Sequence, residues 1–314
     1  MPTTVMLAID LVRLVMEPSI APAHPLSPDQ PFWRVWPLQP TFLIPVLLAA
    51  VLYARGLTRW PERSRAHPWW RSGLFYGGLL TMVLSVNTPL HAISEHHFSA
   101  HMTQHLLITM IGVPLVLLGA PTTPILRGLP RALRHNVLSP LAADPLVRGM
   151  FRVLTHPVTG LVLFSAVLIW WHMVPGWYDL AAEQEGVHEV QHLSFVISAG
   201  LFWWSVIDPA PLHAPMGYLL RIVYVIAEAT VQAVLGAFIS LATEPLYHYY
   251  ERATPIFPIS AIDDQQLGGL IMWIGGQPLF LGVVGALFAV WYVQSERRQR
   301  ESEAAGLEAT ADRY

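Results

Sequence analysis

The stretch HMTQHLLITMIGVPLVLLGA, residues 101–120, decides the fold class of this chain. It is apolar over most of its length, and a helix needs about 20 such residues to cross a membrane. The stretch MGYLLRIVYVIAEATVQAVLGAFISLA, residues 216–242, has the same character. Backbone amides that face lipid must be hydrogen-bonded within their own segment, so both stretches are expected to be helices. The sequence therefore predicts a helical membrane protein.

The composition of the whole chain agrees with this prediction. Of its 314 residues, 54% are hydrophobic and 12% are charged, which is half the charged fraction of about 25% that soluble domains have. The formal net charge is −3 and no long basic segment occurs, which argues against a nucleic-acid-binding protein. Cysteine is absent, which excludes disulfides, thiolate-bound zinc, iron–sulfur clusters and thiol catalysis.

Seven apolar stretches are long enough to be membrane spans, and we predict an all-α, polytopic bundle of seven transmembrane helices over residues 37–293. The predicted spans are 37–55, 72–91, 101–120, 157–175, 188–207, 216–242 and 266–293. Residues 1–36 are expected to form an outer N-terminal tail with a short interfacial helix. Residues 294–314 are expected to form a polar cytoplasmic tail.

The arginines predict the orientation, because every one of the 18 basic residues is arginine. They concentrate in residues 55–71, 127–152 and 297–300, which fall on one side of the membrane if all seven spans are counted. By the positive-inside rule this side is the cytoplasm. The N-terminus is therefore expected outside and the C-terminus inside.

Histidine is unusually common, with 14 in the chain. Nine of them fall at or near the predicted outer ends of spans: His91, His96, His97, His101, His105, His172, His188, His192 and His248. Two pairs within this layer, 101/105 and 188/192, are four residues apart. Residues with this spacing share a helix face, so each pair can direct two ring nitrogens at one ion.

One such pair alone is more often two interfacial histidines than a pair of ligands. Two pairs and His172 from three spans at one depth favour a common ion, because an unpaired polar group is costly at the membrane boundary. Imidazole suits copper, zinc, iron and nickel, whereas thioethers favour Cu(I). The sequence predicts a metal site of His101, His105, His172, His188 and His192, with His97, Met102 and Met173 as additional candidate ligands.

Three other functions remain open. Residues 188–192 (HEVQH) match the HExxH signature of zinc peptidases; because they open a membrane span, we interpret the match as chance and expect no enzyme. Histidines on separate helices could ligate a haem for electron transfer, although pairs four apart are better suited to one ion. Glu228, Gln232 and Gln277 form an intramembrane polar set that an ion transporter could use; Glu228 is expected to be satisfied by Gln277, by Asn87 or by a hydrogen bond of its own protonated carboxyl.

Three stretches resemble the seven-span CtaG-type assembly factors of bacterial cytochrome c oxidases: FSAHMTQHLLITMIGVPLVLLGAP (98–121), HEVQHLSFVISAGLFWW (188–204) and DQQLGGLIMWIGG (264–276). The resemblance covers about 40–293. It implies a multi-pass protein of the bacterial plasma (inner) membrane that helps copper reach a haem–copper oxidase. It also implies that His101, His105, His188 and His192 occupy the recurring positions of that family.

Together, the residues and the resemblance predict an outer-side site that receives copper and passes it to an oxidase subunit. Haem and zinc remain the alternative cofactors. The expected partners are cytochrome c oxidase subunits, a copper donor protein and the lipid bilayer.

Overall fold

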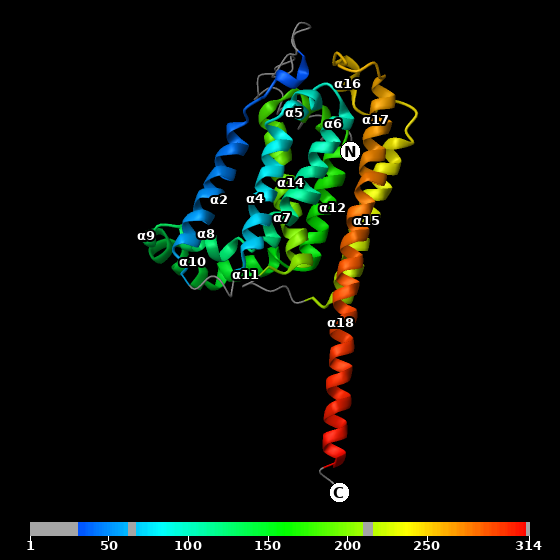
Figure 1. Ribbon diagram of the computed structural model, residues 1–314. Coiled ribbons are helices and arrows are strands. Elements are labelled where there is room, and N and C mark those ends of the chain that lie inside the picture. Colours follow the sequence, from blue (N-terminus) through cyan, green and yellow to red (C-terminus); the bar gives the residue numbers. More distant parts are fainter. Residues whose placement is uncertain (1–30, 62–66, 210–215, 312–314) are drawn as a thin grey trace.

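A computed structural model of the protein describes residues 31–61, 67–209 and 216–311, with residues 304–311 described by their backbone alone. These residues form helices joined by short connections, and none of them is in a β-strand (Figure 1). This confirms the all-α fold class. The interfacial helix expected near the N-terminus lies outside the described residues. The first element within them is a short 3-10 turn, η1 (Phe32–Arg34).

Five helical segments within the described residues are long and apolar enough to cross a membrane. They are α2 (Pro40–Thr58), the continuous segment Phe98–Leu118, α14 (Glu185–Ile207), α15 (Tyr218–Ser240) and the segment Ala261–Glu303. A sixth span results if α11 (Pro145–Leu154) and α12 (Pro157–Met173), which are bent by 60°, count as one. The count of seven and the sidedness of the termini stay predictions.

Residues 72–91 of the predicted second span fall mainly in α4 (Trp69–Val86), which packs in the bundle without reaching the apolarity of the other spans. The mean hydropathy of α4 is lowered by its first turn, which contains Trp69, Trp70 and Arg71. The helix nevertheless lies between α2 and the middle of the bundle (Figure 1). It packs on the segment that carries His101 and His105.

Two of the long segments contain π-helical turns. Residues 98–118 consist of α6 (Phe98–Leu106), the π-helix η2 (Leu107–Gly112) and α7 (Val113–Leu118). The last segment consists of α17 (Ala261–Leu270), the π-helix η4 (Ile271–Gly275) and α18 (Gly276–Ala311). π-Turns inside helices are uncommon and are frequent at functional sites.

The bundle is organised around α14, which packs against α12 on one side and against α7 and η2 on another. The edges are formed by α2 and by α15 with α17 and α18 (Figure 1). Large buried side chains such as Phe164, Phe202, Trp203 and Phe280 fill the centre. Residues 294–311, predicted as a polar tail, continue α18 as a helix that projects beyond the bundle (Figure 1).

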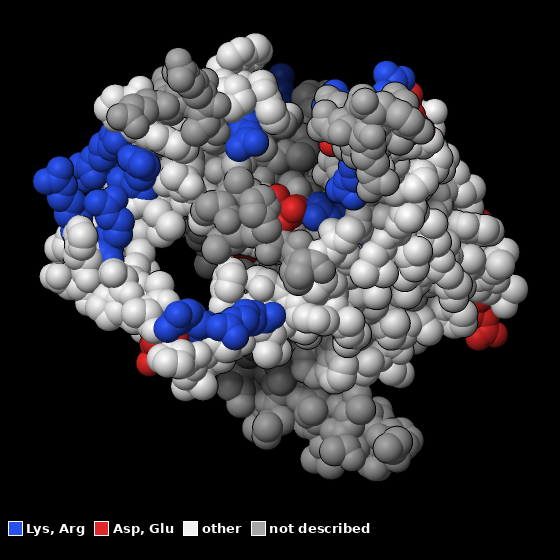
Figure 2. All heavy atoms as spheres, turned by 90° about the horizontal axis from the view of Figure 1, so that it is seen from below, with Lys and Arg blue, Asp and Glu red and all other residues white. Residues whose placement is uncertain are grey.

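The two ends of the bundle differ in composition. The histidine end is formed by the beginnings of α6, α14 and α17 together with three short helices: α5 (Pro89–Ser94), α13 (Trp177–Glu183) and α16 (His248–Arg252). The arginine end is formed by the end of α2, α11 and the short helices α8 (Thr122–Gly128), α9 (Arg131–Leu133), η3 (Arg134–Leu138) and α10 (Ser139–Ala143). Figure 2 shows arginine side chains gathered on this second face.

The arginine-rich connections lie toward the same end of the molecule, as their alternation along the sequence predicts (Figure 1). Helix α11 there exposes Leu146, Met150 and Phe151 together with its arginines. An exposed short helix with apolar and basic faces is typical of a segment that lies along a membrane surface.

Candidate metal centre

Four histidines from two helices converge at the histidine end. His101 and His105 on α6 and His188 and His192 on α14 each offer one ring nitrogen, and these four atoms all lie within 4.8 Å of one another. The Nε2 atoms of His101 and His188 are 3.2 Å apart. Four nitrogens bound tetrahedrally at about 2.0–2.1 Å from an ion are separated by about 3.3 Å. Small movements of the rings would therefore place all four on one ion.

The local sequence explains why the rings of each pair meet. In α6 the ring centroids of His101 and His105 are 4.4 Å apart, and in α14 those of His188 and His192 are 4.3 Å apart. Both distances follow from the spacing of four residues on one helix face. The faces turn toward each other, because the rings of His105 and His192, on different helices, are 5.1 Å apart.

Several nitrogens of these histidines are buried without a hydrogen-bond partner. Within the described part of the chain, this holds for both ring nitrogens of His105 and for Nε2 of His192. Buried polar groups are nearly always hydrogen-bonded, so each exception requires an explanation. A bound cation would supply a partner for one ring nitrogen of His105 and for Nε2 of His192.

Two tyrosines hold the other side of the His101 ring. The hydroxyls of Tyr178 on α13 and Tyr250 on α16 lie 2.9 Å and 3.0 Å from its Nδ1. Because the Tyr250 hydroxyl donates to the carbonyl of Ser94, its oxygen can accept from Nδ1–H. The lone pair of Nε2 then faces the other histidines. Ligating histidines commonly have their second nitrogen held in this way.

Burial raises the pKa of Tyr178 and of Tyr250 well above 10. Both hydroxyls therefore stay protonated at physiological pH, and neither brings a negative charge to the cluster. The sequence analysis missed both tyrosines. Each lies in a short helix between predicted spans, where no periodic pattern relates it to His101.

The structure places His172, the fifth predicted ligand, beside the four rather than among them. Its ring centroid is 6.4 Å from that of His105. Its Nδ1–H donates to the carbonyl of Leu168 at 2.8 Å, so Nε2 carries the lone pair. This Nε2 is buried and has no hydrogen-bond partner within the described residues.

The three additional candidate ligands have different positions. Met102 is buried and lines a small cavity together with His105 and His172. Met173 is 38% exposed, so its thioether is outside the cluster. His97 accepts hydrogen bonds at Nε2 from the amides of residues 256 and 257, and its Nδ1 is 3.6 Å from Asp264. These contacts connect His97 to the loop before α17.

His91 on α5 belongs to the site, although it was not predicted as a ligand. Its ring stacks on that of His188 with the centroids 5.7 Å apart. The side-chain amides of Gln39 and Gln104 lie 3.0 Å and 3.2 Å from its two ring nitrogens. The one indication in the sequence that His91 lies near the metal centre was its place among the nine histidines at the outer ends of the predicted spans.

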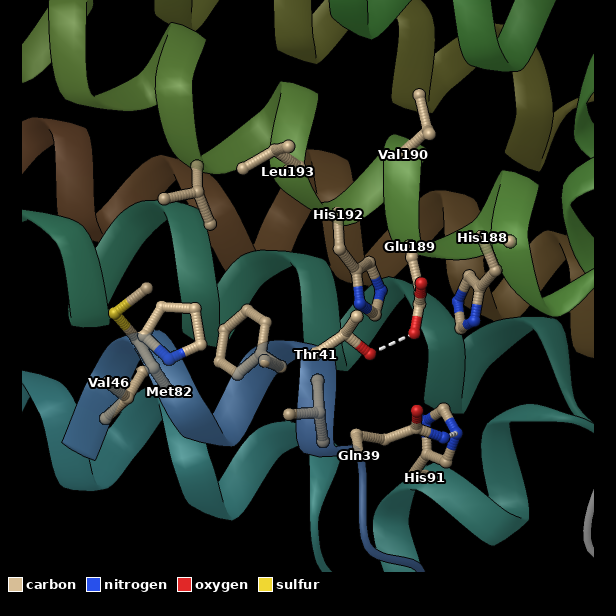
Figure 3. A pocket seen from close by; sticks show the side chains of 15 residues that line it. Gln39, Thr41, Val46, Met82, His91, His188, Glu189, Val190, His192 and Leu193 are labelled. Atoms are coloured by element: carbon tan, nitrogen blue, oxygen red, sulfur yellow. Dashed lines mark hydrogen bonds between the residues drawn. The ribbon is translucent and has the colours of Figure 1, made fainter. Parts of the chain in front are cut away.

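A cavity of about 300 Å³ between α2, α4, α5 and α14 borders the cluster. Figure 3 shows His188 and His192 pointing from α14 toward Thr41 of α2, Gln39 directly before that helix, and His91 of α5. The Thr41 hydroxyl donates to the Glu189 carboxylate. Apolar side chains, among them those of Val46, Met82 and Leu193, line the rest of the cavity, which therefore connects the histidines to the region between α2 and the bundle.

The intramembrane polar residues lie on the other side of the cluster. Glu228 is fully buried and accepts a hydrogen bond of 2.6 Å from Ser165, so the expectation of Gln277 or Asn87 as its partner is wrong. The side-chain amide of Gln232 donates to the carbonyl of Met272 at η4, and that of Gln277 donates to Ala229. These two amides join α15 to the last span.

Comparison with known proteins identifies relatives whose own names assign no function. An uncharacterized protein of Mycobacterium leprae is 26% identical over 275 residues, which are 85% of this chain and 41% of the relative. Uncharacterized proteins of Mycobacterium bovis and Mycobacterium tuberculosis are each 28% identical over 258 residues, 80% of this chain and 38% of the relative. The chain thus spans about two fifths of the length of these curated relatives. No solved structure matches it significantly.

The model of a protein family described as cytochrome c oxidase caa3 assembly factor matches residues 51–294. The match includes all four converging histidines and the helices that carry them. It covers well over half of the chain and agrees with the resemblance seen in the three sequence stretches. The chain belongs to the family of cytochrome c oxidase caa3 assembly factors.

Proposed function

We propose that this protein binds copper at His101, His105, His188 and His192 and passes it to a cytochrome c oxidase subunit during assembly. The family supports the role in oxidase assembly. The observation that carries the copper part is the convergence of four ring nitrogens within 4.8 Å, together with nitrogens of His105 and His192 that are buried without a partner among the described residues. Imidazole is a good ligand for copper.

The charge of the site favours a monovalent ion. The four ligands are neutral imidazoles, and no carboxylate belongs to the group. Glu189, the acidic side chain that lines the adjoining cavity, is hydrogen-bonded to Thr41. The penalty for burying an uncompensated ion increases steeply with its charge. A neutral site therefore holds Cu(I) at a lower penalty than a divalent ion such as Zn²⁺.

The same neutrality suits a carrier. An ion without a compensating negative charge is held less firmly than one bound to carboxylates or thiolates, which favours its release to a partner. The cavity of about 300 Å³ beside His188 and His192 is the proposed route between the site and that partner. The proposed setting is the bacterial plasma membrane with the histidine end outside, where a copper donor and the oxidase subunit would meet it.

Elemental analysis tests the proposal. The protein is purified without added metal as wild type, as His101→Ala/His105→Ala and as the matched control His135→Ala/His156→Ala, whose histidines are exposed at the arginine end. We expect copper in the wild type and in the control and its loss from the first variant. Size-exclusion chromatography in detergent shows whether each variant is folded.

Two results would overturn the proposal. One is a metal content that is equal in all three proteins or is dominated by zinc. The other is a strong Soret band in the visible spectrum of the same wild-type sample, which would mean that the histidines ligate a haem.

A further inference from the structure

A second cavity, of about 30 Å³, lies next to the four-histidine cluster and closer to the middle of the bundle. It is large enough for one small ion or water, since a water needs about 10–15 Å³. Apolar side chains form part of its wall. The residues with donor atoms that line it are Met102, Met110, Met272, His105, Thr109, His172 and Gln232.

The donor atoms around this cavity are neutral, and those of the three methionines are soft. Met102, Met110 and Met272 are each at most 5% exposed, and thioether sulfur prefers Cu(I). His172 adds Nε2, whose lone pair is unshared because Nδ1–H is already bonded to Leu168. A water in this cavity would meet polar atoms of His172, Thr109 and Gln232, whereas the three thioethers, which are weak hydrogen-bond acceptors, favour a soft cation.

The two π-helical segments supply two of the three methionines. Met110 lies in η2, directly after the turn that carries His105, and Met272 lies in η4. A π-turn changes the direction of the side chains that follow it in a helix. In both membrane segments, the π-helical turn therefore lies at residues that line this cavity.

We infer that this cavity is a second metal site, selective for a soft monovalent cation, with the sulfurs of Met102, Met110 and Met272 and Nε2 of His172 as ligands. His105 lines the cavity and also belongs to the four-histidine cluster, so it connects the two sites. This inference rests on the proposed function, in which copper is cargo. A Cu(I) ion can then move between the sites while His105 holds it.

The test compares Ag(I), a redox-inert analogue of Cu(I), with Zn(II), which thioethers bind poorly. The full chain in detergent is expected to bind two Ag(I) ions and one Zn(II). In Met102→Leu/Met110→Leu/Met272→Leu, one Ag(I) is lost and Zn(II) binding is retained; leucine conserves the volume of methionine, so the fold should tolerate it. Met173→Leu, which changes an exposed methionine beside His172, is the matched control and should bind like the wild type.

The reciprocal variant His188→Ala/His192→Ala is expected to lose Zn(II) and to retain one Ag(I). X-ray absorption of that silver should show sulfur ligands. If the triple leucine variant binds as much Ag(I) as the wild type, or if the retained silver has no sulfur ligand, the inference is overturned and the four-histidine site is unaffected. If copper is absent from the four-histidine site while silver is still bound through sulfur, the proposed function fails and the methionine site stands.

The single variant Met110→Leu keeps the test independent of folding. It should weaken the sulfur signal of bound silver in a protein that elutes like the wild type. An unchanged sulfur signal would count against the site.

Discussion

At the arginine end, Nε2 of His67 lies 2.7 Å from the hydroxyl of Tyr53. This hydroxyl also donates to the carbonyl of Gly119, and the Tyr53 ring stacks on Phe75 with ring centroids 3.8 Å apart. At the histidine end, His105 is equally surrounded by rings, yet both of its nitrogens lack a hydrogen-bond partner within the described residues. Both histidines are buried. The difference is therefore not burial but whether the ring nitrogens are satisfied.

This comparison separates a structural histidine from a candidate ligand. His67 has partners that stabilise the contact between α2 and α4. His105 has the desolvation penalty of a buried polar group without the compensating hydrogen bond. A buried histidine with unpartnered nitrogens is expected where the ring has to bind a ligand. The comparison predicts that substitutions at the arginine end alter stability and leave metal binding unchanged. Substitutions at the histidine end should alter metal binding and leave stability unchanged.

The largest effect is expected at the contact between α2 and α8. A Cβ atom at Gly56 would clash with the carbonyl of Pro124, because the two helices approach closely at a small residue. Gly56→Val should lower the free energy of unfolding by about 3 kcal/mol, the upper part of the usual range for overpacking. Denaturant unfolding in detergent micelles measures this.

Gly73→Val on α4 is the control, because no atom lies within 4 Å of a Cβ placed there. Metal affinity should be the same in both variants and in the wild type. A Gly56→Val protein as stable as the wild type, or one that has lost its metal, would contradict the separation of the two ends.

The second effect concerns the tyrosines that orient His101. Tyr178→Phe/Tyr250→Phe removes both hydroxyls from Nδ1 and should weaken metal binding about 10–100-fold, as is usual for partners of ligating histidines. This corresponds to about 1.4–2.7 kcal/mol. Since burial raises the pKa of both tyrosines well above 10, they stay protonated and the loss should be the same at pH 7 and pH 9. Competition with a chelator measures the affinity.

Tyr249→Phe is the control on the same short helix, because the Tyr249 ring packs against that of Tyr250 and against no histidine ring of the described residues. It should bind metal like the wild type. A double variant with unchanged affinity would show that His101 does not need these hydroxyls.

The smallest effect is expected for Glu189→Gln. Glu189 borders the larger cavity and accepts from Thr41, but it does not belong to the metal-binding group. Metal affinity should change less than about twofold, within the ±0.5 kcal/mol of an ordinary polar substitution. The zinc-peptidase alternative makes the opposite prediction, since this carboxylate would be the general base. A peptide-cleavage activity that Glu189→Gln abolishes would support that alternative.

The sequence predicted the parts of the molecule that depend on local pattern. Apolar stretches of span length identified α14 and α15 nearly to their ends, and the spacing of four residues identified both histidine pairs. It did not predict the short helices α8 to α11, because each is too brief for a periodic pattern and has a proline within it or directly before it. It also placed His172 with the four histidines of one site and His97 as an additional candidate ligand, although His172 borders the methionine cavity and His97 contacts the loop before α17.

The amino-acid sequence by itself determined that the chain is helical, that several of its helices are long and apolar enough to cross a membrane, and that two helices each carry a pair of histidines on one face. These properties follow from hydrophobicity and helical periodicity, which act over a few turns. Only the tertiary structure decided that the two faces meet, since His101 and His188 are 87 residues apart and their distance depends on how α6 and α14 pack. It also decided which ring nitrogens remain without partners, because that depends on every neighbouring helix at once.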